Sequence, residues 1–125
     1  MVATVMRLAS QHSTLNFVSD RSGHPTFTAD LAAALLAVGH DRVDATLHIT
    51  NAGAVSWFEF AQEVLAAAGY DRARVEPVLT SKLTPPRPAP RPTNSVLSNQ
   101  AFHELGYAPL RDFRDALGDV ISAYL

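Results

Sequence analysis

The sequence contains no cysteine, so the chain can form no disulfide and offers no thiolate for catalysis or metal binding. No apolar run approaches the roughly 20 residues that a membrane-spanning helix needs, and the first residues lack the apolar stretch and cleavage site of a signal peptide. The formal net charge is −2, so there is no basic excess of the kind that binds nucleic acid or an anionic membrane. We therefore expect a soluble cytoplasmic protein with no nucleic-acid or membrane partner.

Catalytic signatures are also missing. None of the six glycines belongs to a G-x-G-x-x-G or P-loop pattern. The only lysine is Lys82, and no tyrosine lies four residues before it, so a Tyr-x-x-x-Lys proton-donor pair cannot form within the chain. The five histidines show no metal-ligand spacing. The sequence thus predicts no catalytic, cofactor-binding or metal-binding residue in these 125 positions.

What is present is the composition of a folded domain, with 47% hydrophobic and 18% charged residues. Apolar periodicity and turn residues predict, in order, a helix, a strand, a helix, a strand, a helix, a strand, a long loop and two helices. The three strands are expected at residues 14–18, 45–50 and 74–79. This alternation favours the α/β class, here a small helix-rich domain with a few short strands. Because the first apolar stripe begins at Val2 with no capping residue ahead of it, we expect a segment upstream.

Helix starts give the sharpest local predictions. Ser56 with Glu59 three residues later is a capping box, which predicts that a helix starts at Ser56. Thr28 and Ser98 are each expected to cap the helix that follows them. His48, inside the expected strand 45–50, is interpreted as a half-buried structural residue.

Three spans, taken together, resemble one family. DRSGHPTFTADLA looks like a D-x-x-G-x-P-T-x-T-x-D-L-A run, HITNAGAVSWFEFA like H-x-T-N-x-G-x-x-S-W-[YF]-E-F-A, and PAPRPTNSVL like P-A-P-R-P-x-N-S-x-L. The closing LRDFRDAL is similar to the start of the same family's C-terminal helix. The order and spacing of these spans, over nearly the whole chain, resemble the dTDP-4-dehydrorhamnose reductases. Arg21, Ser22 and His24 depart from the pattern, since members more often carry Gln, Phe and Ser there.

The resemblance implies a function for a longer protein. Members are extended short-chain dehydrogenases that use NADPH, or sometimes NADH, to convert dTDP-4-dehydro-L-rhamnose to dTDP-L-rhamnose. They combine an N-terminal Rossmann half with a C-terminal sugar-nucleotide-binding part. Residues 1–125 would be that C-terminal part without the dinucleotide-binding domain, and would be inactive alone. The expected partners are a dTDP-sugar, the Rossmann half and a second copy of the chain; Mg²⁺ is left open as a cofactor of the parent.

Two alternatives stay open at this stage. The same architecture is shared by a regulatory subunit of methionine adenosyltransferase, so the chain could be a non-catalytic binding module. The run PPRPAPRP could also serve as a polyproline ligand for an SH3-type partner.

The resemblance also points to substrate-binding residues. Residues 84–95, TPPRPAPRPTNS, hold five prolines and two arginines, and the prolines make the loop stiff. A guanidinium matches a phosphate bidentately, so Arg91 is expected to reach the diphosphate, with Asn94 and Ser95 bonding the ligand or holding the turn. The alternative for Arg91 is a pair with an acidic surface residue, and Arg87 is expected to be solvated. The remaining candidates lie in the loop of the first span: Gly23, His24, Pro25 and Thr26.

Overall fold

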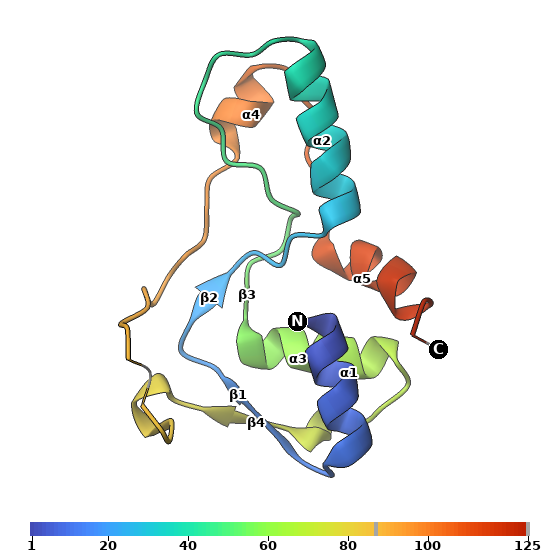
Figure 1. Ribbon diagram of the computed structural model, residues 1–125, viewed down its shortest axis with the longest axis vertical. Coiled ribbons are helices and arrows are strands. Elements are labelled where there is room, and N and C mark those ends of the chain that lie inside the picture. The colour runs from blue at the N-terminus through green and yellow to red at the C-terminus, as the bar shows by residue number, and fades with distance from the viewer. Residues whose placement is uncertain (87, 125) are drawn as a thin grey trace.

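The computed structural model describes residues 1–86 and 88–124. Figure 1 shows a broad part, which holds three helices and the longer of two small sheets, and a narrow part that extends away from it. The helices of the broad part are α1 (Val2–Gln11), α3 (Trp57–Ala67) and α5 (Phe113–Ile121). The narrow part is built around α2 (Thr28–His40) and α4 (Gln100–Glu104).

The strands are short, as expected. β1 (Leu15–Val18) pairs in parallel with β4 (Val75–Val78), and β2 (Ser22–Gly23) pairs antiparallel with β3 (Val55–Ser56). Two short 3₁₀ segments flank β4, namely η1 (Arg72–Arg74) and η2 (Thr80–Lys82). The small, helix-rich α/β class predicted from the sequence is confirmed.

The core lies where α3 meets α1, α5 and the β1–β4 pair. The expected stripe of α1 is confirmed, because Val2, Val5 and Ala9 are buried. α3 supplies the centre, with Val64 and Leu65 fully buried between the other elements. Burial of these apolar faces, rather than helix propensity, stabilises such short helices.

The predicted start of α3 is also confirmed. The Glu59 amide donates to Ser56 Oγ at 3.2 Å, and the Ser56 amide donates to Glu59 Oε2 at 2.7 Å. These bonds form the complete capping box. The backbone bond from Ser56 is the main reason that the pKa of Glu59 is lowered, which keeps its carboxylate ionised.

Four local predictions were wrong. Residues 45–50 form no strand, because no neighbouring strand pairs with them, and His48 is exposed rather than half-buried. Phe27, not Thr28, holds the cap position of α2, and the Phe27 amide donates to Asn51 Oδ1 from across the fold at 2.9 Å. Asn99, not Ser98, precedes α4. At both helix starts the residue before the helix takes part in a long-range hydrogen bond, which periodicity does not report.

In the part of the chain that the structure describes, no helix is long and apolar enough to cross a membrane.

Candidate functional site

Two of the candidate stretches lie side by side at β2. The Ser22 amide donates to the Thr93 carbonyl at 3.0 Å, and the Ser95 amide donates back to the Ser22 carbonyl at 2.9 Å. Ser95 Oγ donates to the same Ser22 carbonyl at 2.8 Å, although the two residues are 73 positions apart in sequence. β3 pairs with the other side of β2. The loop after β1 and the end of the proline-rich segment are therefore held together by backbone bonds.

Gly23 leaves room for this close approach. A Cβ atom at Gly23 would lie 2.8 Å from Ser95 Oγ, closer than van der Waals contact allows. Asn94 holds the turn, because its Oδ1 accepts from the Val96 amide at 2.9 Å. These two candidates shape the backbone beside the site.

One cavity, here named the arginine cavity, has a volume of about 550 Å³. It is lined by Met1, Asn16, Phe17, Val18, Arg21, Trp57, Leu83, Arg91, Pro92 and Ser95. Among the described residues, the lining contains two arginines and no carboxylate. Arg91 makes no hydrogen bond or ion pair with any residue that the structure describes, so the acidic partner considered as an alternative is not seen there. Arg91 is exposed.

A second cavity, the histidine cavity, has a volume of about 360 Å³. His24, Pro25 and Thr26 line it together with apolar side chains, and it shares Met1 and Trp57 with the arginine cavity. His24 Nδ1 is buried and has no hydrogen-bond partner among the described residues. The two cavities are thus adjacent across Trp57, the first residue of α3, whose side chain is 36% exposed.

The predicted site residues therefore divide by position. Arg91 and Ser95 face the arginine cavity, while His24, Pro25 and Thr26 face the histidine cavity. Gly23 and Asn94 lie in the paired backbone between them. Arg87 lies outside the described residues.

Sequence reasoning missed a polar cluster that joins the two parts of the fold. Asn51 is fully buried, and its Nδ2 donates to Asp30 Oδ2 at 2.6 Å and to the Arg111 carbonyl at 3.1 Å. Arg111 in turn pairs with Asp30 at 3.0 Å and with Asp119 at 2.7 Å. The bond from Arg111, followed by that from Asn51, lowers the pKa of Asp30. Asn51, Asp30 and Arg111 all lie within the sequence spans that resemble the family. That resemblance was the signal in the sequence that could have pointed to them.

In the described ranges, no group of three or more His, Asp or Glu side chains could hold a metal ion.

Arg21 is a further residue that the site predictions omitted. It lines the arginine cavity and hydrogen-bonds two threonines from distant segments.

The chain is thus a small α/β domain with a cavity lined by two arginines and, among the described residues, no carboxylate. The family model of the RmlD substrate binding domain matches residues 1–125, and the chain belongs to this family. The family expected from the sequence spans is thereby confirmed.

The chain is also similar to individual proteins named dTDP-4-dehydrorhamnose reductase. The chain is 43% identical over 123 residues to the dTDP-4-dehydrorhamnose reductase of Mycolicibacterium smegmatis, covering 98% of this chain and 37% of that protein. Its fold is similar to a solved dTDP-4-dehydrorhamnose reductase from Clostridium acetobutylicum, with a TM-score of 0.92 and 35% identity over 99% of this chain and 43% of that one. A Bacillus anthracis dTDP-4-dehydrorhamnose reductase, solved in complex with NADP, gives a TM-score of 0.89 at 27% identity, covering 100% of this chain and 43% of that one. The chain thus spans about two fifths of the length of these relatives.

Proposed function

We propose that residues 1–125 are the C-terminal, sugar-nucleotide-binding portion of a dTDP-4-dehydrorhamnose reductase. The observation that carries the proposal is the arginine cavity, a carboxylate-free cavity with two guanidinium groups, in a member of a substrate-binding domain family. A dTDP-sugar presents a diphosphate, which is the group that such a lining binds best. Relatives named as reductases favour this proposal over a non-catalytic module.

The arrangement suggests how the ligand would be held. Arg91 would bond the diphosphate, and the stiffness of its segment would lower the entropy lost on binding. Ser95 Oγ already donates to the Ser22 carbonyl, so its lone pairs are left to accept from a ligand hydroxyl. Trp57 offers an apolar surface between the two cavities on which a ring could pack. His24, Pro25 and Thr26 would then contact the part of the ligand that enters the histidine cavity.

In the whole protein, we propose that hydride from NADPH or NADH reaches the C4 carbonyl carbon of the sugar while a proton is delivered to its oxygen. This chain contains neither the dinucleotide fingerprint nor a Tyr-x-x-x-Lys pair, so the cofactor and the proton donor would come from a Rossmann half. The role of residues 1–125 would be to bind and orient the sugar nucleotide, and these residues alone would not turn over substrate. A cytoplasmic location, contact with the Rossmann half and self-association belong to the same proposal.

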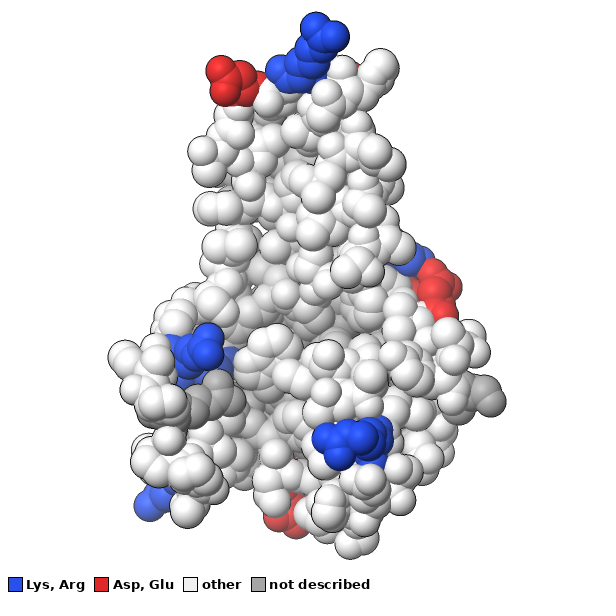
Figure 2. All heavy atoms as spheres, viewed as in Figure 1, with Lys and Arg blue, Asp and Glu red and all other residues white. Residues whose placement is uncertain are grey.

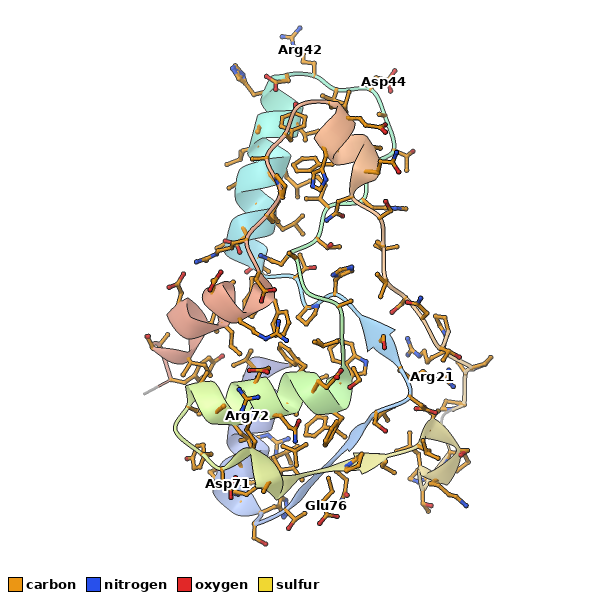
Figure 3. All side chains as sticks on the ribbon, turned by 180° about the vertical axis from the view of Figure 1, so that it is seen from behind. Arg21, Arg42, Asp44, Asp71, Arg72 and Glu76 are labelled. Atoms are coloured by element: carbon orange, nitrogen blue, oxygen red, sulfur yellow. The ribbon has the colours of Figure 1, made fainter. Side chains whose placement is uncertain are left out.

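Calorimetric titration with dTDP tests the binding role. The 125-residue chain should bind dTDP, and Arg91→Ala should weaken binding by about 1.5–3 kcal/mol, or roughly ten- to a hundredfold, because a charge-assisted bond is lost. Arg42→Ala is the matched control, since Arg42 is exposed at the far end of the narrow part (Figure 3). A chain that is folded but does not bind dTDP, or equal effects of the two substitutions, would contradict the proposal.

A further inference from the structure

Arg21 occupies a distinctive position in the arginine cavity. It follows β1 and precedes β2, at the place where these strands approach η2 and the end of the proline-rich segment (Figure 3). Its Nε donates to Thr80 Oγ1 at 3.1 Å, and its Nη1 donates to Thr93 Oγ1 at 2.7 Å. The guanidinium is therefore fixed between two segments and is half-buried. Arg91, on the opposite loop of the same cavity, has no such anchors among the described residues.

The carboxylate of Asp20, next to Arg21 in the sequence, already accepts hydrogen bonds from another residue. Asp20 accepts from the Thr80 amide at 3.1 Å and from Thr80 Oγ1 at 2.7 Å, so a chain of bonds runs from Arg21 through Thr80 to Asp20. The Thr80 hydroxyl bond is the first cause of the lowered pKa of Asp20, so this carboxylate stays ionised. Asp20 does not line the arginine cavity and makes no ion pair with Arg21 within the described part of the chain. Its charge is directed at Thr80 rather than at the cavity.

Arg21 has N–H groups left to donate to a ligand. A guanidinium has five N–H groups, and two of those of Arg21 have acceptors among the described residues. The other three, including both on Nη2, are free to donate to phosphate oxygens. Because the side chain is already held by Thr80 and Thr93, binding an anion would cost it little additional conformational entropy.

We infer that Arg21 is a second anion-binding residue, and that Arg21 and Arg91 together make the cavity selective for a diphosphate over a monophosphate. The inference rests on the proposed function and deepens it, because each of the two negative phosphates would meet its own guanidinium. Arg21, as the better anchored cation, contributes at least as much to affinity as Arg91. A monophosphate can engage only one of the two well, so it binds more weakly.

Arg21→Gln is the decisive variant, because glutamine keeps an amide group that can reach as far as the Arg21 Nε that bonds Thr80 but carries no charge. Titrations of the chain with dTDP, dTMP, thymidine and inorganic pyrophosphate would be compared. Wild type should bind dTDP more tightly than dTMP, and Arg21→Gln should weaken dTDP and pyrophosphate roughly ten- to a hundredfold while leaving thymidine unchanged. The salt dependence of dTDP binding should also become shallower in the variant.

The outcomes separate the two proposals. If wild type binds pyrophosphate in an Arg21-dependent way but shows no preference for thymidine nucleotides, the anion site stands and the proposed dTDP-sugar function fails. If Arg21→Gln binds dTDP and pyrophosphate as wild type does, or if wild type binds neither, the inference is wrong. Should Arg21→Gln not fold, Arg21→Lys is the second variant, because lysine lacks the planar fork whose remaining N–H groups are assigned to the phosphate and should also weaken dTDP binding. A folded Arg21→Lys that binds dTDP and pyrophosphate as wild type does would overturn the inference.

Discussion

At the scale of single residues, the tightest constraints fall on positions where two distant segments touch. Gly53 has a φ of 91°, in the left-handed region, and a Cβ atom there would lie 2.7 Å from Phe113 Cδ1 and 2.8 Å from Asp112 Oδ2. The neighbouring backbone pairs Ala52 with the start of α5, through bonds to the Arg111 carbonyl and from the Phe113 amide. Only glycine fits the conformation and the space at this junction.

Gly53→Ala should therefore destabilise the fold by roughly 2 kcal/mol or more, from backbone strain and from the clash with a buried ring. Gly118→Ala is the matched control, because Gly118 lies inside α5 and a Cβ there meets nothing within 4 Å. That control should stabilise the protein by about 0.5–1 kcal/mol, since alanine favours a helix interior. Urea unfolding followed by circular dichroism measures both changes. Equal effects of the two substitutions would show that the backbone at Gly53 can accommodate a Cβ atom without strain.

Prediction of single residues from the sequence succeeded where the interacting residues are close together in the sequence. Ser56 and Glu59 were identified from their spacing, and the structure has both bonds. Asn51 could not be recognised in this way, because its partners are 21 and 60 positions away. Arg21 was noted only as a departure from a motif, since its two threonine partners come from segments 59 and 72 positions away.

At the scale of elements, α3 organises the broad part and its N-terminus is the best defined helix start. Ser56→Ala should cost about 1 kcal/mol, within a range of roughly 0.5–2, because the Glu59 amide loses its acceptor. Ser98→Ala is the control, since Ser98 is exposed and accepts only one long bond, at 3.3 Å, from the Gln100 amide. It should change stability by less than about 0.5 kcal/mol. A larger loss from Ser98→Ala than from Ser56→Ala in urea unfolding would contradict this assignment of caps.

The same capping box has a pH signature. The folded pKa of Glu59 lies below its ordinary value of 4.5, so the ionised carboxylate contributes stability that is complete above pH 4.5 and is lost as the pH falls through the folded pKa. The stability difference between wild type and Glu59→Gln should accordingly shrink below pH 4.5. A difference that stayed constant down to pH 3 would mean that the charge of Glu59 does not contribute.

The expected strand at residues 45–50 shows what element prediction lacks. Its β-rich composition predicted a strand, but a strand needs a neighbour, and neither small sheet extends to it. The proline-containing strand β4 has β1 as its single neighbour among the described strands, an edge position that tolerates proline. The strands expected at 14–18 and 74–79 therefore formed, while the one expected at 45–50 did not, because pairing depends on neighbours in three dimensions.

At the scale of the whole molecule, the narrow part exposes unusual apolar surface. In α2 the side chains of Leu35 and Leu36 are 54% and 75% exposed, and Ala34 is its one buried residue. Figure 2 shows a mostly uncharged surface along this part, with charges gathered near its tip. The exposed leucines of α2 supply a physical reason for the self-association proposed above.

Light scattering over a dilution series should therefore detect concentration-dependent dimers of wild type, most simply symmetric ones in which α2 packs against α2. Leu36→Gln should shift the equilibrium towards monomer, because it places a polar group at the most exposed leucine of that face. Leu79→Gln, at a 50% exposed leucine in the broad part, is the control and should leave dimerisation unchanged. Monomer at every concentration would refute the proposal, and equal effects of both substitutions would place the contact away from α2. If Leu36→Gln is monomeric and still binds dTDP, then the apolar face and the arginine cavity are independent features, as their separation between the two parts of the fold predicts.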